Sequence, residues 1–232
     1  MSVQTRGSER VVAVVPAAGH GSRLGGTDKV LLPLGGRPLI AYCLEALQHS
    51  PLVDEIVLVL RDPEGGRRLV QAEGFSKVKN ICSGGPRRQD SVREGLKLVG
   101  QCDFVLIHDG ARPFLTERLI REGIEAARET GGAVAAVPVT ETIKLAGEDG
   151  LVEATPPRAS LFTAQTPQVF RPDVLRRAHE KPSEDVTDDA SMVERMGLRV
   201  RLYPGSYDNI KITTPEDLAV ADALLKRRRA SA

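Results

Sequence analysis

The sequence has little cysteine and no long apolar run. Its three cysteines, Cys43, Cys82 and Cys102, stand far apart and form no CxxC or Cys/His spacing, which disfavours both a disulfide scaffold and a zinc site. No apolar run approaches the roughly 18 residues that a membrane span requires. The first nine residues, MSVQTRGSE, lack the apolar core of a signal peptide. We therefore expect a cytoplasmic protein with no membrane partner.

Net charge is also nearly absent. The 32 Lys and Arg residues are balanced by 31 Asp and Glu residues, which leaves +1. This balance provides no overall field to attract nucleic acid, so an anionic ligand would be held by a local cluster and is expected to be small. A basic run at residues 226–229 is typical of a solvated helix end. The length of 232 residues fits a single globular domain, residues 1–232.

The best-known phosphate-binding and catalytic motifs are missing as well. No Gly-Lys pair occurs, which excludes a Walker A loop, and after Gly19 and Gly21 the third position of a GxGxxG motif is Leu24. The four histidines form no Ser/His/Asp or metal-ligand pattern. These absences disfavour a P-loop ATPase, a plain Rossmann dehydrogenase and a hydrolase that depends on a histidine base.

Short apolar runs alternate with segments of helical period, which predicts an α/β fold. The runs rich in β-branched residues lie at 11–15, 55–60, 78–82, 104–108 and 133–139. Between them, residues 39–47 and 119–127 place apolar side chains on one helical face. The last helix has Thr214 as N-cap, Pro215 in its first turn and Asp217 three residues after the cap. We expect three layers around a mostly parallel sheet.

One stretch departs from this alternation. Residues 140–157, TETIKLAGEDGLVEATPP, alternate polar and apolar side chains around the turn Glu148-Asp149-Gly150, which predicts a β-hairpin arm. An isolated hairpin is marginally stable in water and needs a surface to lie on. A partner subunit could provide that surface.

The segment from Val14 to Gly36 reads as a strand that ends in a glycine-rich loop. Glycines at 19 and 21 allow the backbone to approach a ligand, while Arg23 and Lys29 add positive charge. Because ligands of open α/β sheets bind beyond the carboxyl ends of the strands, this loop is a candidate anion cradle. The alternative is a tight connection with no ligand.

Three further polar segments follow predicted strands. In HDGARP, Asp109 could ligate a hard cation and Arg112 could meet an anion, although an Asp at a strand end can also cap a turn. SGGPRRQDS, residues 83–91, follows another strand, and YDNIKITTPEDL is expected to place Asp208 and Lys211 on a short strand. Several polar loops at one sheet edge indicate a binding site.

The motifs PAAGHGSRL followed by a lysine, GG-x3-QDSV, HDGARP, QTPQVF, TDDAS and DNIKITTPEDL occur in this order. Together they resemble the cytidylyltransferases that act on 2-C-methyl-D-erythritol 4-phosphate. The resemblance extends from about Val11 to Leu225, and it implies a Rossmann-like sheet of the nucleotidyltransferase type. It also implies transfer of the cytidylyl group of CTP in the methylerythritol phosphate route to isoprenoid precursors, with Mg²⁺ as cofactor. A homodimer held partly by the arm at residues 140–157 is a further implication.

The resemblance implies roles for individual residues. It assigns Arg23 and Lys29 as transition-state cations, and Arg158 and Lys211 as residues that position the second substrate. The residues implied at the nucleotide site are Ala17, Ala18, Gly19, Gly21, Gly85, Ser91, Asp109 and Gly110. Magnesium is assigned to Asp109 and Asp208, and polar contacts around the second substrate to Arg112, Thr142, Thr166 and Thr187. Asp28 and Val30 flank Lys29 where the family commonly has Pro and Gln.

Two alternatives remain open from the sequence. A cytidylyltransferase for another polyol phosphate, such as ribitol 5-phosphate, would share the nucleotide loops and differ mainly within residues 140–190. A nucleotide-sensing protein without catalysis would not need Arg23, Lys29, Asp109 and Lys211 together.

Overall fold

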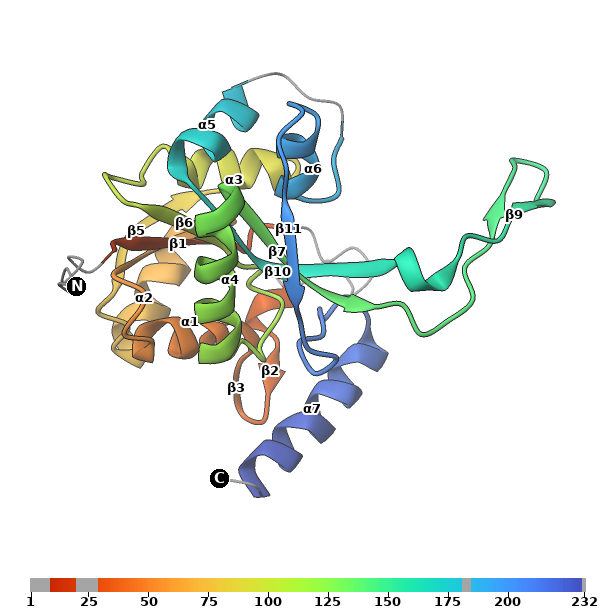
Figure 1. Ribbon diagram of the computed structural model, residues 1–232. Helices are drawn as coiled ribbons and strands as arrows, with labels where there is room; N and C mark the ends of the chain where they lie inside the picture. The colour runs from red at the N-terminus through yellow and green to blue at the C-terminus, as the bar shows by residue number, and fades with distance from the viewer. Residues whose placement is uncertain (1–8, 20–28, 181–184, 231–232) are drawn as a thin grey trace, which may run out of the picture.

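The computed structural model describes residues 9–19, 29–180 and 185–230. Its central feature is a seven-stranded sheet with the strand order β11-β7-β10-β6-β1-β4-β5 (Figure 1). The strands are β1 (Val11–Pro16), β4 (Glu55–Leu60), β5 (Val78–Ser83), β6 (Phe104–Ile107), β7 (Gly132–Pro138), β10 (Phe162–Phe170) and β11 (Arg201–Pro204). β10 runs antiparallel to β6 and β7, and the remaining neighbours are parallel. The predicted α/β fold with a mostly parallel sheet is confirmed.

All five strands expected from apolar runs form, but the sheet contains two more. β10 includes the motif QTPQVF, and β11 forms one edge of the sheet. The prediction of a short strand around Asp208 and Lys211 is wrong. Residues 207–214, which the structure describes throughout, form a turn followed by backbone with no regular secondary structure. In place of a strand ladder, separate hydrogen bonds hold this segment, among them one from the Ile212 N–H to the Ala111 carbonyl oxygen at 2.9 Å.

Helices cover both faces of the sheet. The helices that pack against it are α1 (Leu39–His49), α2 (Pro63–Glu73), α3 (Arg88–Leu96), α4 (Glu117–Thr130), α5 (Pro172–Glu180) and α6 (Asp189–Glu194). α3 begins three residues before Ser91, where the sequence alone placed the helical stretch. Apolar residues of α1, α2 and α4 pack on one face of the sheet, and those of α3, α5 and α6 pack on the other.

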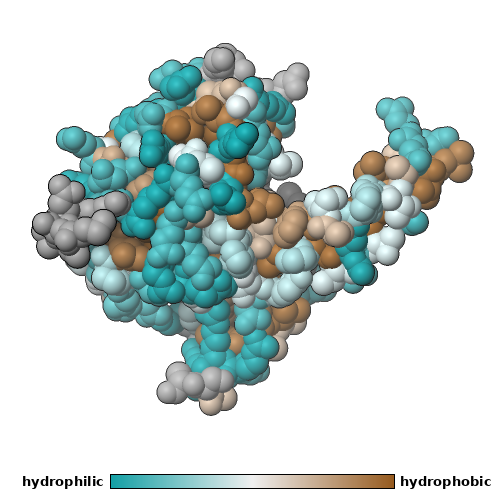
Figure 2. Space-filling model, in the orientation of Figure 1, coloured by the Kyte–Doolittle hydropathy of each residue, from teal (hydrophilic) through white to brown (hydrophobic). Residues whose placement is uncertain are grey.

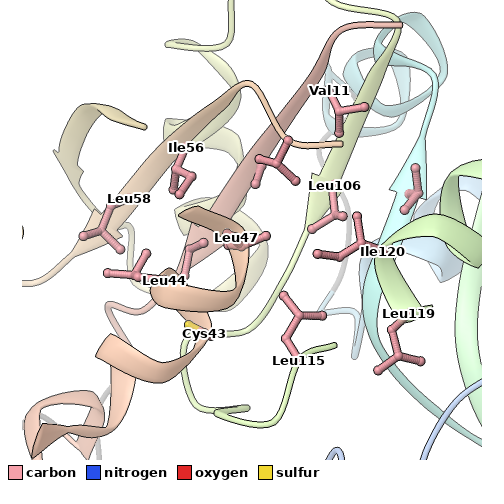
Figure 3. Close-up of a cluster of buried hydrophobic side chains, with 14 of the residues drawn as sticks. Val11, Cys43, Leu44, Leu47, Ile56, Leu58, Leu106, Leu115, Leu119 and Ile120 are labelled. Atoms are coloured by element: carbon pink, nitrogen blue, oxygen red, sulfur yellow. The ribbon is translucent and has the colours of Figure 1, made fainter. Parts of the chain in front are cut away.

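The core follows from the alternation of side chains along the strands. Val11, Ala13 and Val15 of β1 face α1 and α4, whereas Val12 and Val14 face α3. Figure 3 shows the first of these clusters, in which side chains of α1 and α4 meet those of β1, β4 and β6. Burial on both faces explains why these strands read as continuous apolar runs.

The last helix, α7 (Pro215–Ala230), lies beside a small two-stranded sheet of β2 (Pro33–Leu34) and β3 (Arg37–Pro38), which follows the 3-10 helix η2 (Lys29–Leu31). Ala221 and Leu225 of α7 pack into a third cluster with Phe114. The basic run is the end of this helix, as expected. Within it, the Arg228 guanidinium lies 4.7 Å from the centroid of the Phe114 ring.

The predicted hairpin forms and stands away from the rest of the molecule (Figure 1). It consists of β8 (Leu145–Ala146) and β9 (Val152–Ala154), and the 3-10 helix η3 (Arg158–Ser160) follows it. The turn is closed by the Gly150 N–H, which donates to the Gly147 carbonyl. Apart from this hairpin and α7, the described elements form one layered body.

Candidate active site

Four loops meet at the carboxyl end of the sheet and enclose a cavity of about 170 Å³. They follow β1, β5 and β6 and precede α7, which is the position expected for a ligand site in an open α/β sheet. The residues that line the cavity are Pro16, Ala17, Ala18, Gly19, Val30, Gly85, Pro86, Arg87, Arg88, Ser91, Asp109, Ala111 and Lys211. A larger hollow of about 450 Å³ lies between α3 and α5, but it includes none of the strand-end residues.

Asp109 is the carboxylate at the centre of this cavity, and three cations surround it. Its Oδ1 atom accepts a hydrogen bond from Arg88 Nε at 2.9 Å, and its Oδ2 atom lies 2.8 Å from Lys211 Nζ. Arg112 Nε is further away, at 3.9 Å from Oδ2. Only 8% of the Asp109 side chain is exposed. The cluster therefore carries excess positive charge, which suits a polyanionic ligand.

The surroundings of Asp109 determine its protonation state. Burial opposes ionisation, but the charges of Arg88, Lys211 and Arg112 outweigh it and hold the pKa of Asp109 well below its usual range. Burial also lowers the pKa of the neighbouring His108 to about 4. At neutral pH the site thus contains an ionised carboxylate and an uncharged imidazole.

Buried polar residues behind the cavity hold the Asp109 loop in place through hydrogen bonds. The Asp109 N–H donates to Thr166 Oγ1 at 3.0 Å, and His108 Nε2 lies 3.0 Å from the Arg112 carbonyl oxygen. Arg112 Nη1 donates to the Asn209 carbonyl oxygen at 2.7 Å, and Asn209 Nδ2 donates to the Thr166 carbonyl oxygen at 2.7 Å. These bonds join the loop after β6 to β10 and to the segment before α7.

Small residues allow the loops to approach one another. A Cβ atom at Gly84 would collide with the side chain of Ala18, and one at Gly85 would collide with that of Asp90. At Gly110 a Cβ atom would lie 2.9 Å from that of Ala17. Side chains at these positions would therefore push the loops apart and enlarge or distort the cavity.

The chain matches known proteins over nearly its whole length. A family model described as 2-C-methyl-D-erythritol 4-phosphate cytidylyltransferase matches residues 11–227. The chain belongs to this family.

A curated relative of the same name from Dehalococcoides mccartyi is 49% identical over 224 residues, which cover 96% of this chain and 99% of the relative. Another, from Geobacter metallireducens, is 46% identical and covers 94% of this chain and 98% of its own length. A crystal structure of 4-diphosphocytidyl-2C-methyl-D-erythritol synthase from Anaerococcus prevotii has a TM-score of 0.82 and 32% identity, and the match covers 95% of this chain and all of that one. The enzyme class and the family resemblance expected from the sequence are confirmed.

The structure brings many of the predicted site residues together. Those that line the cavity are Ala17, Ala18, Gly19, Gly85, Ser91, Asp109 and Lys211. Gly110, Arg112 and Thr166 lie immediately behind it, in the packing and hydrogen bonds described above. Residues that follow four different elements thus converge on one site, although their individual roles stay predictions.

The glycine-rich loop is only partly described. Gly21 and Arg23 lie outside the described residues, and of Lys29 only the backbone, at the start of η2, is described. The prediction that Arg23 and Lys29 are transition-state cations therefore stays a prediction.

Other predicted residues lie apart from the cavity lining. Thr142 is exposed on the arm, and Arg158 Nη1 donates to the Thr140 carbonyl oxygen at 2.9 Å at the base of the arm. Thr187 is exposed between α5 and α6. Asp208 Oδ2 pairs with Arg227 Nη2 of α7 at 2.5 Å. Their assignments to substrate and metal stay predictions.

Sequence reasoning missed Arg88 and Asp189. Arg88 lines the cavity and contacts Asp109, and its Nη1 atom lies 2.8 Å from Asp189 Oδ2. The motif SGGPRRQDS contained a signal for Arg88, because two arginines follow a glycine pair at a strand end. In TDDAS, by contrast, no pattern separates Asp188, which caps α6, from the buried Asp189.

A magnesium ion fits this site with few protein ligands. In the described part of the chain, no cluster of three or more His, Cys, Asp or Glu side chains could hold a metal, and Asp109 is the one carboxylate among the cavity-lining residues. Mg²⁺ commonly binds through one or two carboxylates and takes its other oxygens from phosphates and water. Asp109 would hold the ion, in competition with Arg88 and Lys211.

Proposed function

We propose that the reaction of this family takes place in the cavity at the carboxyl ends of β1, β5 and β6. The reaction is transfer of the cytidylyl group of CTP to 2-C-methyl-D-erythritol 4-phosphate, which yields 4-diphosphocytidyl-2-C-methyl-D-erythritol and pyrophosphate. The observation that carries the placement is the cluster of Asp109, Arg88 and Lys211 between two glycine-containing loops.

The chemistry of the acceptor explains why the cavity needs no general base. A phosphomonoester has a second pKa of about 6, so it is already largely a dianion at neutral pH. The imidazole of His108 is buried, and its Nε2 atom is already hydrogen-bonded to the Arg112 carbonyl oxygen. The remaining difficulty is electrostatic, because one polyanion attacks the α-phosphorus of another.

Positively charged side chains of the protein would reduce the repulsion between the two polyanions. Lys211 stands at the cavity wall and would meet the acceptor phosphate, while Arg23 and Lys29 of the glycine-rich loop would act on the triphosphate, as the family resemblance implies. Arg158 would complete the acceptor pocket. Asp109 would hold a magnesium ion, which would supply positive charge to offset that of the phosphates, and Asp208 would be a second ligand only if it leaves Arg227.

We also propose that the chain works as a cytoplasmic homodimer. The arm exposes Leu145, Leu151 and Val152, of which 51, 69 and 59% is accessible, and Figure 2 shows apolar surface along the arm. A hairpin this small is marginally stable alone, and a twofold arrangement of arms would cover both copies. Among the described residues no helix is long and apolar enough to cross a membrane.

The experiment that tests this function measures pyrophosphate release with CTP and 2-C-methyl-D-erythritol 4-phosphate, in parallel with ribitol 5-phosphate and with ATP. We expect turnover with the first pair only, and inhibition by EDTA. Lys211→Ala should lower kcat/KM about a hundredfold or more, because the cation that meets the acceptor phosphate is lost.

Lys226→Ala is the matched control, since Lys226 is exposed and pairs with Asp222 on the outer surface of α7. It should retain wild-type activity. Equal rates with ribitol 5-phosphate would contradict the substrate assignment, and an undiminished rate in Lys211→Ala would contradict the site.

A further inference from the structure

A chain of alternating charges extends from the cavity into the interior between α3, α5 and α6. Arg88 bridges two carboxylates, with Nε 2.9 Å from Asp109 Oδ1 and Nη1 2.8 Å from Asp189 Oδ2. The second oxygen of Asp189, Oδ1, lies 3.0 Å from His179 Nε2. Asp189 has no exposed surface, and 3% of the His179 side chain is exposed. The cavity is thus connected through Arg88 to a fully buried Asp-His pair.

The buried carboxylate of Asp189 is not the N-cap of α6. The N-cap of α6 is Asp188, whose side chain accepts a hydrogen bond from the Ser191 N–H. Asp189 is the first residue of the helix, and its backbone would make the same hydrogen bonds if its side chain were apolar. Burial of an unpaired carboxylate is strongly unfavourable, and a well-packed apolar residue is often more stabilising than a buried ion pair. The two partners of Asp189 therefore point to a task outside α6.

That task is the orientation of the Arg88 guanidinium. A guanidinium is a rigid, planar group, so contacts on two of its edges fix its plane. With Arg88 held by Asp189, its Nε–H is directed at one oxygen of Asp109 and leaves the other oxygen to Lys211. The Asp109 carboxylate is then held from both sides. A lysine at position 88 could not do this, because its single ammonium group cannot contact two carboxylates on opposite sides with fixed geometry.

We propose that Arg88 is a positioning residue for the reaction in this cavity, and that Asp189 and His179 act through Arg88 to fix the Asp109 carboxylate. The proposal rests on the proposed function. Partners of this kind around a site residue typically contribute about 10- to 100-fold to activity. Loss of these contacts should lower kcat more than it raises KM for CTP. The reason is that the backbone of the glycine loops, which would bind the nucleotide, is not part of the network.

The test is a double-mutant cycle in the full-length chain with Arg88→Lys, Asp189→Asn and the double variant. We expect each single change to lower kcat by about 10- to 100-fold, with a smaller change in KM for CTP. If Asp189 acts through Arg88, the double variant should be no slower than the slower single variant, because residues of one network do not contribute independently. His179→Asn should give a smaller loss of kcat and no further loss in the Arg88→Lys background.

A purely structural role predicts a different result. It would lower the melting temperature, measured by circular dichroism, and leave kcat within about threefold of wild type at a temperature at which all variants are folded. The control for the Arg-to-Lys change is Arg201→Lys, because Arg201 forms an exposed ion pair with Glu129 far from the cavity. This control should keep wild-type kcat.

The outcomes separate this proposal from the one on which it rests. A wild-type chain that releases no pyrophosphate from CTP and 2-C-methyl-D-erythritol 4-phosphate overturns the proposed function and, with it, the role of Arg88. An active wild-type chain in which the losses of Arg88→Lys and Asp189→Asn multiply, or in which either single variant keeps its kcat, overturns the positioning network alone.

Discussion

At the scale of single residues, the role proposed for Asp109 conflicts with its surroundings. As a metal ligand it should be accessible to an ion, yet in the structure it neutralises Arg88 and Lys211 and lies near Arg112. Loss of one partner from a buried ion pair leaves an uncompensated charge, which is strongly destabilising. The carboxylate therefore contributes to the stability of the fold, whatever its role in the proposed chemistry.

This conflict leads to a prediction for Asp109→Asn. The variant should lose activity and also about 3 kcal/mol of unfolding free energy, because Arg88, Lys211 and Arg112 are left with one buried counter-charge fewer. Pyrophosphate should raise its melting temperature more than that of the wild type, since an added anion replaces the missing charge. Thermal unfolding with and without pyrophosphate measures both effects.

Asp222→Asn serves as the control for this experiment. Asp222 forms an exposed pair with Lys226 on α7, and removal of such a pair changes stability by about 1 kcal/mol or less. An Asp109→Asn variant that is as stable as Asp222→Asn, with no added response to pyrophosphate, would show that the carboxylate is not needed to balance the cations.

At the scale of elements, the start of α7 determines where Lys211 stands. Asp217 Oδ2 accepts hydrogen bonds from the Thr213 N–H at 2.7 Å and from the Thr214 N–H at 2.9 Å, while the Asp217 N–H donates to Thr214 Oγ1 at 3.4 Å. The Ile212 N–H in turn donates to the Ala111 carbonyl oxygen. The cap and this bond together hold Lys211 against the loop after β6.

Asp217→Ala should therefore lower the free energy of unfolding by about 1 to 2 kcal/mol at pH 7, because the Thr213 and Thr214 N–H groups lose the carboxylate that completes the cap. Burial opposes ionisation of Asp217, but the hydrogen bonds from Thr213 and Thr214 outweigh it and lower its pKa from 3.8. A depressed acid pKa stabilises the fold above the ordinary value, and this stability is lost as the pH falls through the lowered pKa. The difference between wild type and variant should thus be constant above about pH 5 and shrink below pH 3.8.

Urea unfolding across this pH range measures the difference. Glu216→Ala is the appropriate control, because Glu216 is exposed in the same first turn and its replacement removes the same interaction with the helix dipole without removing the cap. Equal losses in the two variants, or a difference that grows as the pH falls, would argue against the cap.

At the scale of the whole molecule, the arm is the feature that a single chain does not explain. Leu145 and Val152 of the hairpin are exposed, and among the strands that the structure describes, β8 and β9 pair only with each other. Replacement of residues 144–152 by a short Gly/Ser bridge should shift the protein toward the monomer, because the apolar face that a second copy would cover is lost. It should also sharply lower turnover while CTP binding survives, since the nucleotide loops lie on the main body.

Light scattering reports the mass of the deletion variant, calorimetry its affinity for CTP, and pyrophosphate release its rate. The wild-type chain, measured at the same concentration, is the reference. A deletion variant that remains dimeric and fully active would refute the role of the arm in assembly.

The sequence by itself determined the elements that depend on neighbouring residues. The β-branched runs gave β1, β4, β5, β6 and β7, because burial on both faces leaves a continuous apolar run. Thr214 and Asp217 marked the start of α7, and the turn at Gly150 marked the hairpin, since caps and turns are made within a few residues. The loops of the site were recognised for the same reason, because they follow strands whose carboxyl ends share one edge.

Only the tertiary structure decided which distant segments meet. β10 lies antiparallel between β6 and β7, and nothing local in QTPQVF specifies those neighbours. Arg88 finds its two carboxylates 21 and 101 positions away, so no spacing in the sequence predicts the bridge. Asp188 and Asp189 are adjacent and chemically identical, yet one caps a helix and the other is buried against Arg88. The direction in which each side chain points is set by the packing of α6 against α3 and α5, which forms only when the chain is folded.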